Sequence, residues 1–532
     1  MAEVIIPKTG QRIPCAEGDL LLKVLLEKGI FVDNPCNGKG ICGKCKVRIL
    51  SGSILPVIKE EEKFLSIQEQ KEGIRLSCLT GVRGSIEIEL LQKERKHSVL
   101  TKGYVPEFEK DRFDSGYGIA IDIGTTTVVT ALIELKTGKE LANTSMINAQ
   151  KHYGLDVLTR ITYEYEQEEK GIRELQKAIV DSVNAMISAV CQDAGVRKED
   201  IREIDVAANC TMMHMLLGVD ARPIGRAPYK PKFTSAKTLP AKEIGIEAGE
   251  KTVLYCLPHV SAYIGADIVA GAYVCELQKQ KGNVLFIDIG TNGEIVLVSN
   301  GRLLCCSCAA GPALEGMNIS SGMRAAEGAI EDICITEQGV LLTTIGDKEP
   351  AGLCGSGILS VVKELLLSGI IKKTGVFIKK DKLAQDDYRY PMIRMNGTKR
   401  EFILCKEPLL LVTQGDVRQV QLAKGAILSG FLALLNKAGI GMEDLDQVMI
   451  AGQFGAHLPV SSLIGTGILP EGVKEKLVYV GNSSKTGAYM ALLSHKVKEE
   501  IERLAEQMEY MELSETENYE RLFTESMIFP SV

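Results

Sequence analysis

The pattern of hydrophobic and polar positions in residues 1–93 differs from that in the rest of the chain. Apolar runs are short there: VIIP, the amphipathic stretch LLKVLLEKGI, and the runs CKVRILSGSI and GSIEIELLQ with period-two alternation. This pattern predicts a small, strand-rich domain with one short helix. Residues 94–116 are charged and show neither helical nor strand periodicity, so we predict a linker there.

From residue 117 onward, apolar strand patterns alternate with helical patterns. GYGIAIDIGTTTVVTALIEL predicts strand, turn and strand, and helical patterns follow at about 155–165 and 171–194. The order restarts with VLFIDIGTNGEIVLVSNGRLL, in which the letters D-I-G-T recur about 166 residues after their first appearance. A repeat at that distance predicts a duplicated α/β domain, and we place the two copies at 117–282 and 283–532.

Composition excludes several classes of protein. The chain has 532 residues, 45% apolar and 25% charged, which is the balance of a folded globular protein. Its net charge of −7 argues against a nucleic-acid binder. No apolar run reaches the roughly 18 residues of a membrane span, and the first residues lack the features of a signal peptide. We therefore expect a cytoplasmic protein with no membrane and no nucleic-acid partner.

Four cysteines form the sharpest chemical motif. They follow the spacing C-x5-C-x2-C-x32-C in NPCNGKGICGKCKV and RLSCLTG: Cys36, Cys42, Cys45 and Cys78. Four thiolates can hold two irons bridged by sulfides, and the loop glycines let backbone N–H groups approach the sulfurs. A zinc ribbon usually offers two short C-x2-C pairs, so a [2Fe–2S] cluster is favoured over zinc or unligated buried thiols. Cys15 lies outside the loop and is expected to be structural.

The two D-x-G-T turns are the second motif. A carboxylate at a strand end followed by Gly-Thr places N–H groups and hydroxyls beside a phosphate, with the carboxylate facing a divalent metal. One such turn can be an ordinary β-turn, but two at matching positions of a duplicated fold indicate nucleotide binding. We assign Asp122 and Asp288 as the catalytic, Mg²⁺-facing carboxylates.

Residues 1–93 resemble the [2Fe–2S] ferredoxins, on the cysteine spacing above. The resemblance implies a β-grasp fold. It also implies that Cys36 and Cys42 hold one iron while Cys45 and Cys78 hold the other.

The remainder resembles the superfamily of actin, Hsp70 and sugar kinases (ASKHA), whose lobes are RNase H-like. The expected fold class is therefore α/β and α+β multidomain. The segment IAGQFGAHL would be the adenosine motif, and YVGNSSKTGA contributes residues near the cleft. The resemblance implies that residues of the two turns, of the adenosine motif and of YVGNSSKTGA bind the nucleotide: Gly124, Thr125, Thr126, Gly290, Thr291, Asn292, Gly452, Gln453, Gly455, Gly481 and Asn482. A sugar kinase would need a catalytic aspartate; the sequence shows no clear equivalent, and Asp267 in YIGADIVAG is the residue that stays open for this role.

A ferredoxin unit, a linker and an ASKHA region with IDIGTTTVV, FIDIGTNGEIVL, CGSGI and AGQFG together resemble the reductive activators of corrinoid-dependent methyl-transfer proteins. This resemblance covers essentially the whole chain. It implies an ATP-dependent enzyme that passes one electron from the cluster to an inactive Co(II) corrinoid protein and regenerates Co(I). The implied partners are that corrinoid protein, an upstream low-potential electron donor and a second copy of the chain.

Two other functions stay open at this point. The cluster could gate the nucleotide lobes of a redox-sensing regulator, or the chain could be a small-molecule kinase with a fused ferredoxin. The CCSC run, Cys305, Cys306 and Cys308, lacks ligand spacing, so we interpret its side chains as small and buried. His214 and His259 lie beside apolar runs and are expected in the core.

Overall fold

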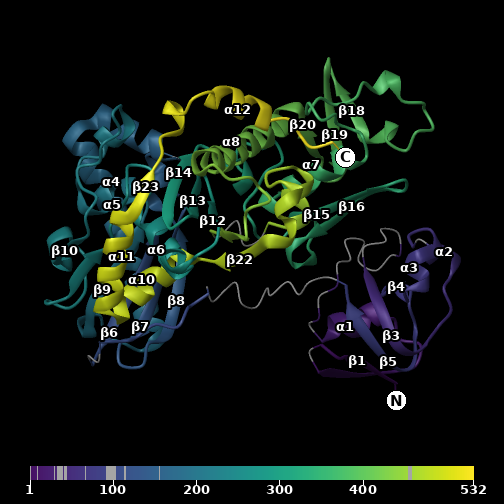
Figure 1. Cartoon of the computed structure of the whole chain (residues 1–532), viewed down its shortest axis with the longest axis horizontal. Helices are drawn as coiled ribbons and strands as arrows, with labels where there is room; N and C mark the ends of the chain where they lie inside the picture. Colours follow the sequence, from purple (N-terminus) through teal and green to yellow (C-terminus); the bar gives the residue numbers. More distant parts are fainter. Residues whose placement is uncertain are drawn as a thin grey trace. The chain divides into compact units, whose positions relative to one another are not determined.

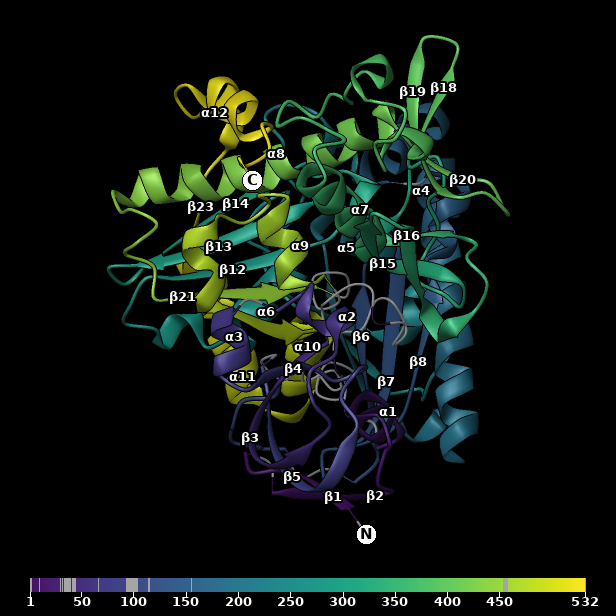
Figure 2. The same cartoon turned by 90° about the vertical axis from the view of Figure 1, so that its right-hand side faces the viewer.

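The structure is a computed structural model. It describes residues 2–8, 10–28, 30, 32, 40, 45–65, 67–91, 104–112, 115–154, 156–452 and 458–531. The chain forms two compact units. The first comprises Met1–His97, Ala313–Gln421 and Phe529–Val532, and the second comprises Ser98–Pro312 and Leu422–Ile528. Figures 1 and 2 show the chain in two perpendicular views.

The N-terminal region forms a mixed sheet in the order β2-β1-β5-β3-β4. Its strands are β1 (Ala2–Ile6), β2 (Gln11–Cys15), β3 (Lys46–Ile54), β4 (Ile74–Leu76) and β5 (Val82–Leu90), and its longest helix is α1 (Leu21–Glu27). β1 and β5 run parallel, with Val4 opposite Ile86, while β1 pairs antiparallel with β2. Val4, Leu25, Val47 and Ile88 are fully buried beneath the sheet. This is the expected β-grasp arrangement.

Two further sheets share a plan of five strands, and each adds a sixth strand at a different edge. The first has the order β10-β11-β9-β6-β7-β8 and the second β22-β21-β12-β13-β14-β23. In each, three antiparallel strands are followed by parallel neighbours on one side. The first sheet comprises β6 (Tyr117–Ile123), β7 (Thr127–Glu134), β8 (Lys139–Ile147), β9 (Ile201–Ala208), β10 (Lys237–Pro240) and β11 (Val253–Cys256). The second comprises β12 (Val284–Ile289), β13 (Gly293–Ser299), β14 (Arg302–Cys308), β21 (Gln447–Ala451), β22 (Leu477–Gly481) and β23 (Met508–Tyr510).

The helices show how the chain crosses between these sheets. They are α4 (Val157–Ala194), α5 (Cys210–Leu217), α6 (Ala266–Val274), α8 (Gln414–Ala438), α9 (Val460–Gly465), α10 (Ser483–Leu493), α11 (His495–Gln507) and α12 (Tyr519–Ser526). Although α10 comes late in the sequence, it packs against α6, β6 and β9 of the first sheet (Figure 1). The chain then returns, and β23 pairs with β14 of the second sheet. The two helical patterns of α4 meet at Glu168, whose φ of 50° interrupts the helix.

Residues 313–421 form smaller elements of the first unit. The strands of this segment form two three-stranded sheets, in the orders β16-β15-β17 and β18-β19-β20. They are β15 (Ala329–Thr336), β16 (Gly339–Thr344), β17 (Gly352–Leu353), β18 (Ile393–Asn396), β19 (Lys399–Cys405) and β20 (Leu410–Thr413), with helix α7 (Gly355–Leu367) against β15. Among the residues that the structure describes, every helix is too short or too polar to cross a membrane.

Candidate functional site

Two of the four motif cysteines lie side by side in the N-terminal sheet. Cys45 precedes β3 and Cys78 follows β4, and their sulfurs are 3.2 Å apart in a buried position. Hydrogen bonding with Cys78 lowers the pKa of Cys45 to about 7 against the effect of burial. Cys36 and Cys42 lie outside the described residues.

The thiol pair fits a metal centre. Two sulfurs bound to one tetrahedral metal at about 2.3 Å lie roughly 3.8 Å apart, so Cys45 and Cys78 need only a small adjustment to share an iron. A thiolate is the form that ligates, and the lowered pKa of Cys45 favours it. Gly40 adopts φ +73°, and a Cβ there would lie 2.7 Å from Leu79 Cδ2, so this turn of the loop needs glycine.

A buried ion pair holds the strand that precedes Cys78. Arg75 on β4 donates Nε–H and Nη2–H to the two oxygens of Glu61, at 2.8 and 2.7 Å. Glu61 also accepts the backbone N–H of Leu76 at 2.7 Å. Because both charged groups are buried and paired, removal of either would leave the other uncompensated.

The first D-x-G-T turn, between β6 and β7, is braced from three sides. Asn209, which caps α5, donates to Thr125 Oγ1 at 3.0 Å. Arg160 of α4 donates to Thr125 O at 2.6 Å, and Asn148 donates to Gly124 O at 3.0 Å. Burial lowers the pKa of Arg160 to about 10. These contacts fix the backbone of the turn, which also contains Thr126.

The carboxylate of this turn is bound by a segment far away in sequence. Asn482 Nδ2 donates to Asp122 Oδ2 at 3.0 Å, and Ser484 Oγ donates to Asp122 Oδ1 at 2.8 Å. Asn482 caps α10, so Asp122 also faces the N-terminus of that helix. Gly481, at the end of β22 with φ +73°, directs the chain into this cap.

The second turn brings Asp288 to the end of β12, beside Gly452. Gly452 adopts φ +88°, and a Cβ on it would lie 2.4 Å from Asp288 Oδ1, so only glycine allows this approach. Gly290 N–H donates to Asn292 O and closes the turn that contains Thr291. Burial, and then the charge of Asp122, raise the pKa of Asp288 to about 7. Gln453 and Gly455 lie outside the described residues.

Two more carboxylates share this electrostatic environment. Burial, followed by the charges of Asp288 and Asp122, raises the pKa of Asp267 at the start of α6 to about 8. Burial and the charges of Asp267 and Asp288 likewise raise the pKa of Glu294 on β13. Buried carboxylates whose charges act on one another in this way repel until protons or a cation balance them. Their oxygens suit a hard divalent cation. The N-termini of α6 and α10, at Asp267 and Asn482, suit phosphate.

Sequence reasoning missed Glu294 and Ser484. Glu294 had a detectable signal, since it is the one charged residue in the apolar run GEIVLVS of a strand. Ser484 had none, because its role depends on the packing of α10 against β6. Sequence patterns offer Asp267 only as a kinase base, whereas in the structure the charges of both motif aspartates contribute to its raised pKa.

The other cysteine and histidine clusters lie in the core. Cys305, Cys306 and Cys308 on β14 are buried, and burial raises the pKa of each thiol. Cys210, His214 and His259 lie within metal-ligating distance of one another. However, His214 Nδ1 contacts Cys210 O at 2.8 Å and Nε2 accepts Lys232 N–H, so both ring nitrogens are occupied. We interpret this group as packing.

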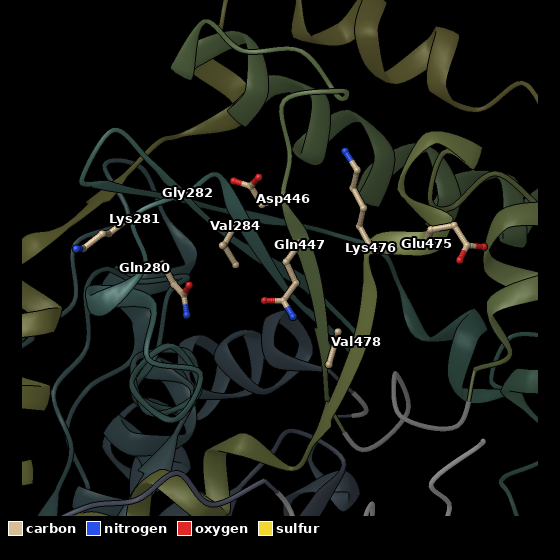
Figure 3. Close-up of a pocket in the computed structure, with 9 residues that line it drawn as sticks. All are labelled: Gln280, Lys281, Gly282, Val284, Asp446, Gln447, Glu475, Lys476 and Val478. Carbon is tan, nitrogen blue, oxygen red and sulfur yellow. The ribbon is translucent and has the colours of Figure 1, made fainter. Parts of the chain in front are cut away.

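A pocket of about 510 Å³ lies at the opposite end of the second sheet, where β12, β21 and β22 begin. Figure 3 shows that Gln280, Val284 and Gln447 line its centre while the Lys281 and Lys476 side chains extend to its margins. The amine of Lys476 is held by Glu443 O and Leu445 O. This pocket is separate from the carboxylate site.

Comparison with known proteins identifies the family. Residues 4–83 match the 2Fe-2S iron-sulfur cluster binding domain, residues 117–280 the RACo middle region, and residues 282–532 the C-terminal domain of RACo, the ASKHA domain. The chain is 35% identical over 418 residues to the corrinoid activation enzyme RamQ of Eubacterium limosum, covering 75% of this chain and 68% of that protein. It is 27% identical over 426 residues to the [Co(II) methylated amine-specific corrinoid protein] reductase of Methanosarcina barkeri, covering 74% and 73%.

A solved structure extends the similarity to the full length. The chain aligns with a reductive activator for corrinoid, iron-sulfur protein at 30% identity and a TM-score of 0.72, covering 100% of this chain and 98% of that one. The expected fold class, a [2Fe–2S] ferredoxin domain followed by ASKHA lobes, is confirmed. The chain belongs to the family of reductive activators of corrinoid proteins.

Proposed function

We propose that this protein uses ATP with Mg²⁺ to drive the reduction of an inactive Co(II) corrinoid protein to Co(I), one electron at a time. The observation that carries the proposal is the presence in one chain of a buried thiol pair in a 2Fe-2S domain and of paired carboxylate turns in an ASKHA region. A bound [2Fe–2S] cluster supplies single electrons.

The residues divide into two groups with different tasks. Cys36, Cys42, Cys45 and Cys78 hold the cluster. Asp122 and Asp288 face the Mg²⁺ of the nucleotide, and the backbone of the two turns cradles its phosphates. Gly452, Gln453 and Gly455 contact adenosine. Support comes from the convergence of Asp122, Asp288 and Gly452 in the structure.

Energetics explain why a redox domain is joined to a nucleotide site. For one electron, each 59 mV of uphill potential costs a factor of ten, so a donor couple kept half reduced leaves only roughly one per cent of the acceptor reduced across a gap of about 120 mV. ATP can change this only through differential affinity for states of the complex. The nucleotide lobes therefore favour either a state that binds the Co(II) partner well and the Co(I) partner poorly, or a state that changes the ligation of the cobalt.

The organisation we propose is a ferredoxin domain at 1–93, a linker at 94–116 and lobes at 117–282 and 283–532. An upstream low-potential donor reloads the cluster, and two copies of the chain associate. The described cysteines form no disulfide, which supports the cytoplasm as its compartment.

The test combines metal analysis with the visible spectrum of a corrinoid protein. We expect about two irons and two sulfides per chain, and ATP-dependent conversion of Co(II) to Co(I). The variant Cys78→Ser should lose or distort the cluster and stop conversion, while nucleotide binding persists. Zinc in place of iron after anaerobic purification would contradict the cluster. A phosphorylated small molecule would indicate a kinase, and nucleotide binding without cobalt reduction would indicate a regulator.

A further inference from the structure

Residues 104–112, here called the strap, are ordered on the surface of the second unit although their sequence has no periodicity. The backbone N–H of Tyr104 donates to Val480 O of β22, the edge strand of the second sheet, at 3.4 Å. The ring of Phe108 meets Tyr489 of α10 edge-on, with centroids 6.2 Å apart. Lys110 donates to Thr137 O at 3.0 Å.

The C-terminal end of the strap is bound much more firmly than its beginning. Asp111 accepts the backbone N–H groups of His495 and Lys496 at 2.7 and 2.9 Å, at the start of α11. Arg112 pairs with Glu203 of β9. Glu203 also pairs with Lys498, so the Arg112 end joins a buried charge network. Breaking such a network leaves uncompensated charge, which keeps this end in place.

The strap therefore touches both sheets and crosses α10. Its firm end contacts β9 of the first sheet, and its weak end contacts β22 of the second. Val480, the weak contact, lies two residues before Asn482, which binds Asp122. A rearrangement around Asp122 consequently acts on the same short segment that holds Tyr104.

We propose that the strap couples the nucleotide site to the length of the tether that carries the ferredoxin domain. This inference rests on the proposed function, in that it takes Asp122 as part of the nucleotide site. Nucleotide binding shifts Asn482 and frees the Tyr104 end from β22, while the Arg112 end stays fixed. At about 3.4 Å per extended residue, release of residues 104–110 lengthens the tether by at most about 24 Å. The electron carrier thereby reaches a docked partner only when nucleotide is bound.

The chain contains no tryptophan, so one introduced tryptophan can serve as the sole tryptophan fluorescence reporter. Tyr104→Trp places one at the weak end of the strap in the full-length, cluster-loaded protein. Tyr104 is 48% exposed, so full release about doubles its exposed area. We expect its acrylamide quenching constant to rise about twofold on addition of a non-hydrolysable ATP analogue with Mg²⁺. Tyr165→Trp, at an exposed position of α4, should not change.

Two variants of the strap, each made in the Tyr104→Trp protein, sharpen the test. Phe108→Ala removes the ring contact with α10, so quenching should be high without nucleotide and show no further rise. Glu109→Ala removes only an exposed ion pair with Lys496 and should behave like the parent. Calorimetry should show a higher nucleotide affinity in Phe108→Ala, because the nucleotide no longer has to release the strap, and an unchanged affinity in Glu109→Ala.

The outcomes separate this inference from the proposed function. If calorimetry detects the nucleotide but quenching at position 104 stays constant or falls, the strap does not respond and the inference is overturned, while the nucleotide site stands. If no nucleotide binds, both fail.

Discussion

The two D-x-G-T turns share four letters and the same place in their sheets, yet their carboxylates differ. Asp122 accepts hydrogen bonds on both oxygens, from Asn482 and Ser484. Burial raises the pKa of both carboxyls, that of Asp288 to about 7, whereas the approach to Asp288 is shaped by Gly452. The difference arises because α10 packs against the first sheet. A duplicated motif has thus produced one carboxylate that joins elements of the fold and one that lies against the backbone of Gly452.

The largest effect is expected at Asp288. Asp288→Asn should lower ATP hydrolysis by about a hundredfold, since under the proposed function it removes a charge that faces the metal of the nucleotide. Its melting temperature without nucleotide should not fall, because the substitution also removes a buried, repelled charge. Steady-state phosphate release and thermal denaturation check both points. Full hydrolysis in this variant would mean that the nucleotide lies elsewhere.

Asp122→Asn should impair hydrolysis and also destabilise the fold. The amide can accept on one side only, so one of the donors from Asn482 and Ser484 loses its acceptor, at a cost of about 1–3 kcal/mol. Urea unfolding of nucleotide-free protein measures this. Equal stability of the Asp122 and Asp288 variants would remove the distinction between the two turns.

The raised pKa of Asp288 predicts a pH effect of known sign. In the unfolded chain this carboxyl releases its proton near pH 4, and in the folded protein at about 7. Its stabilising contribution is therefore complete below pH 4 and is lost as the pH rises toward and through 7. In metal-free protein, the stability of Asp288→Asn relative to the parent should increase between pH 4 and 8. A constant difference would contradict the burial of the charge.

A smaller effect is expected for Ser484→Ala. It removes one of the two hydrogen bonds to Asp122 and should cost about 1 kcal/mol with a modest loss of ATP hydrolysis. Ser514→Ala, at an exposed hydroxyl that bonds Glu512 far from the site, is the control. A loss of hydrolysis as large as that of Asp288→Asn would show that Ser484 contacts the nucleotide directly.

Sequence patterns predict the four cluster cysteines and both motif aspartates because each signal is local. Cysteine spacing and a repeated turn need no knowledge of the fold. The contacts of Ser484 and of the strap could not be predicted from sequence, because they join residues that lie far apart in the chain. Ser484 lies 362 residues from Asp122, and the strap owes its order to α10, α11 and β9 instead of its own periodicity. Periodicity in the sequence detects helices and strands. An extended segment that is held by side-chain contacts has no such periodicity, so its sequence resembles that of a linker.

The most direct test of the central claim is the visible spectrum of a Co(II) corrinoid partner mixed with the full-length, reduced protein, with and without ATP and Mg²⁺. We predict conversion to Co(I) that requires ATP and that both Cys78→Ser and Asp288→Asn abolish or strongly slow. Equal conversion without ATP, or conversion that survives in Cys78→Ser, would contradict the account.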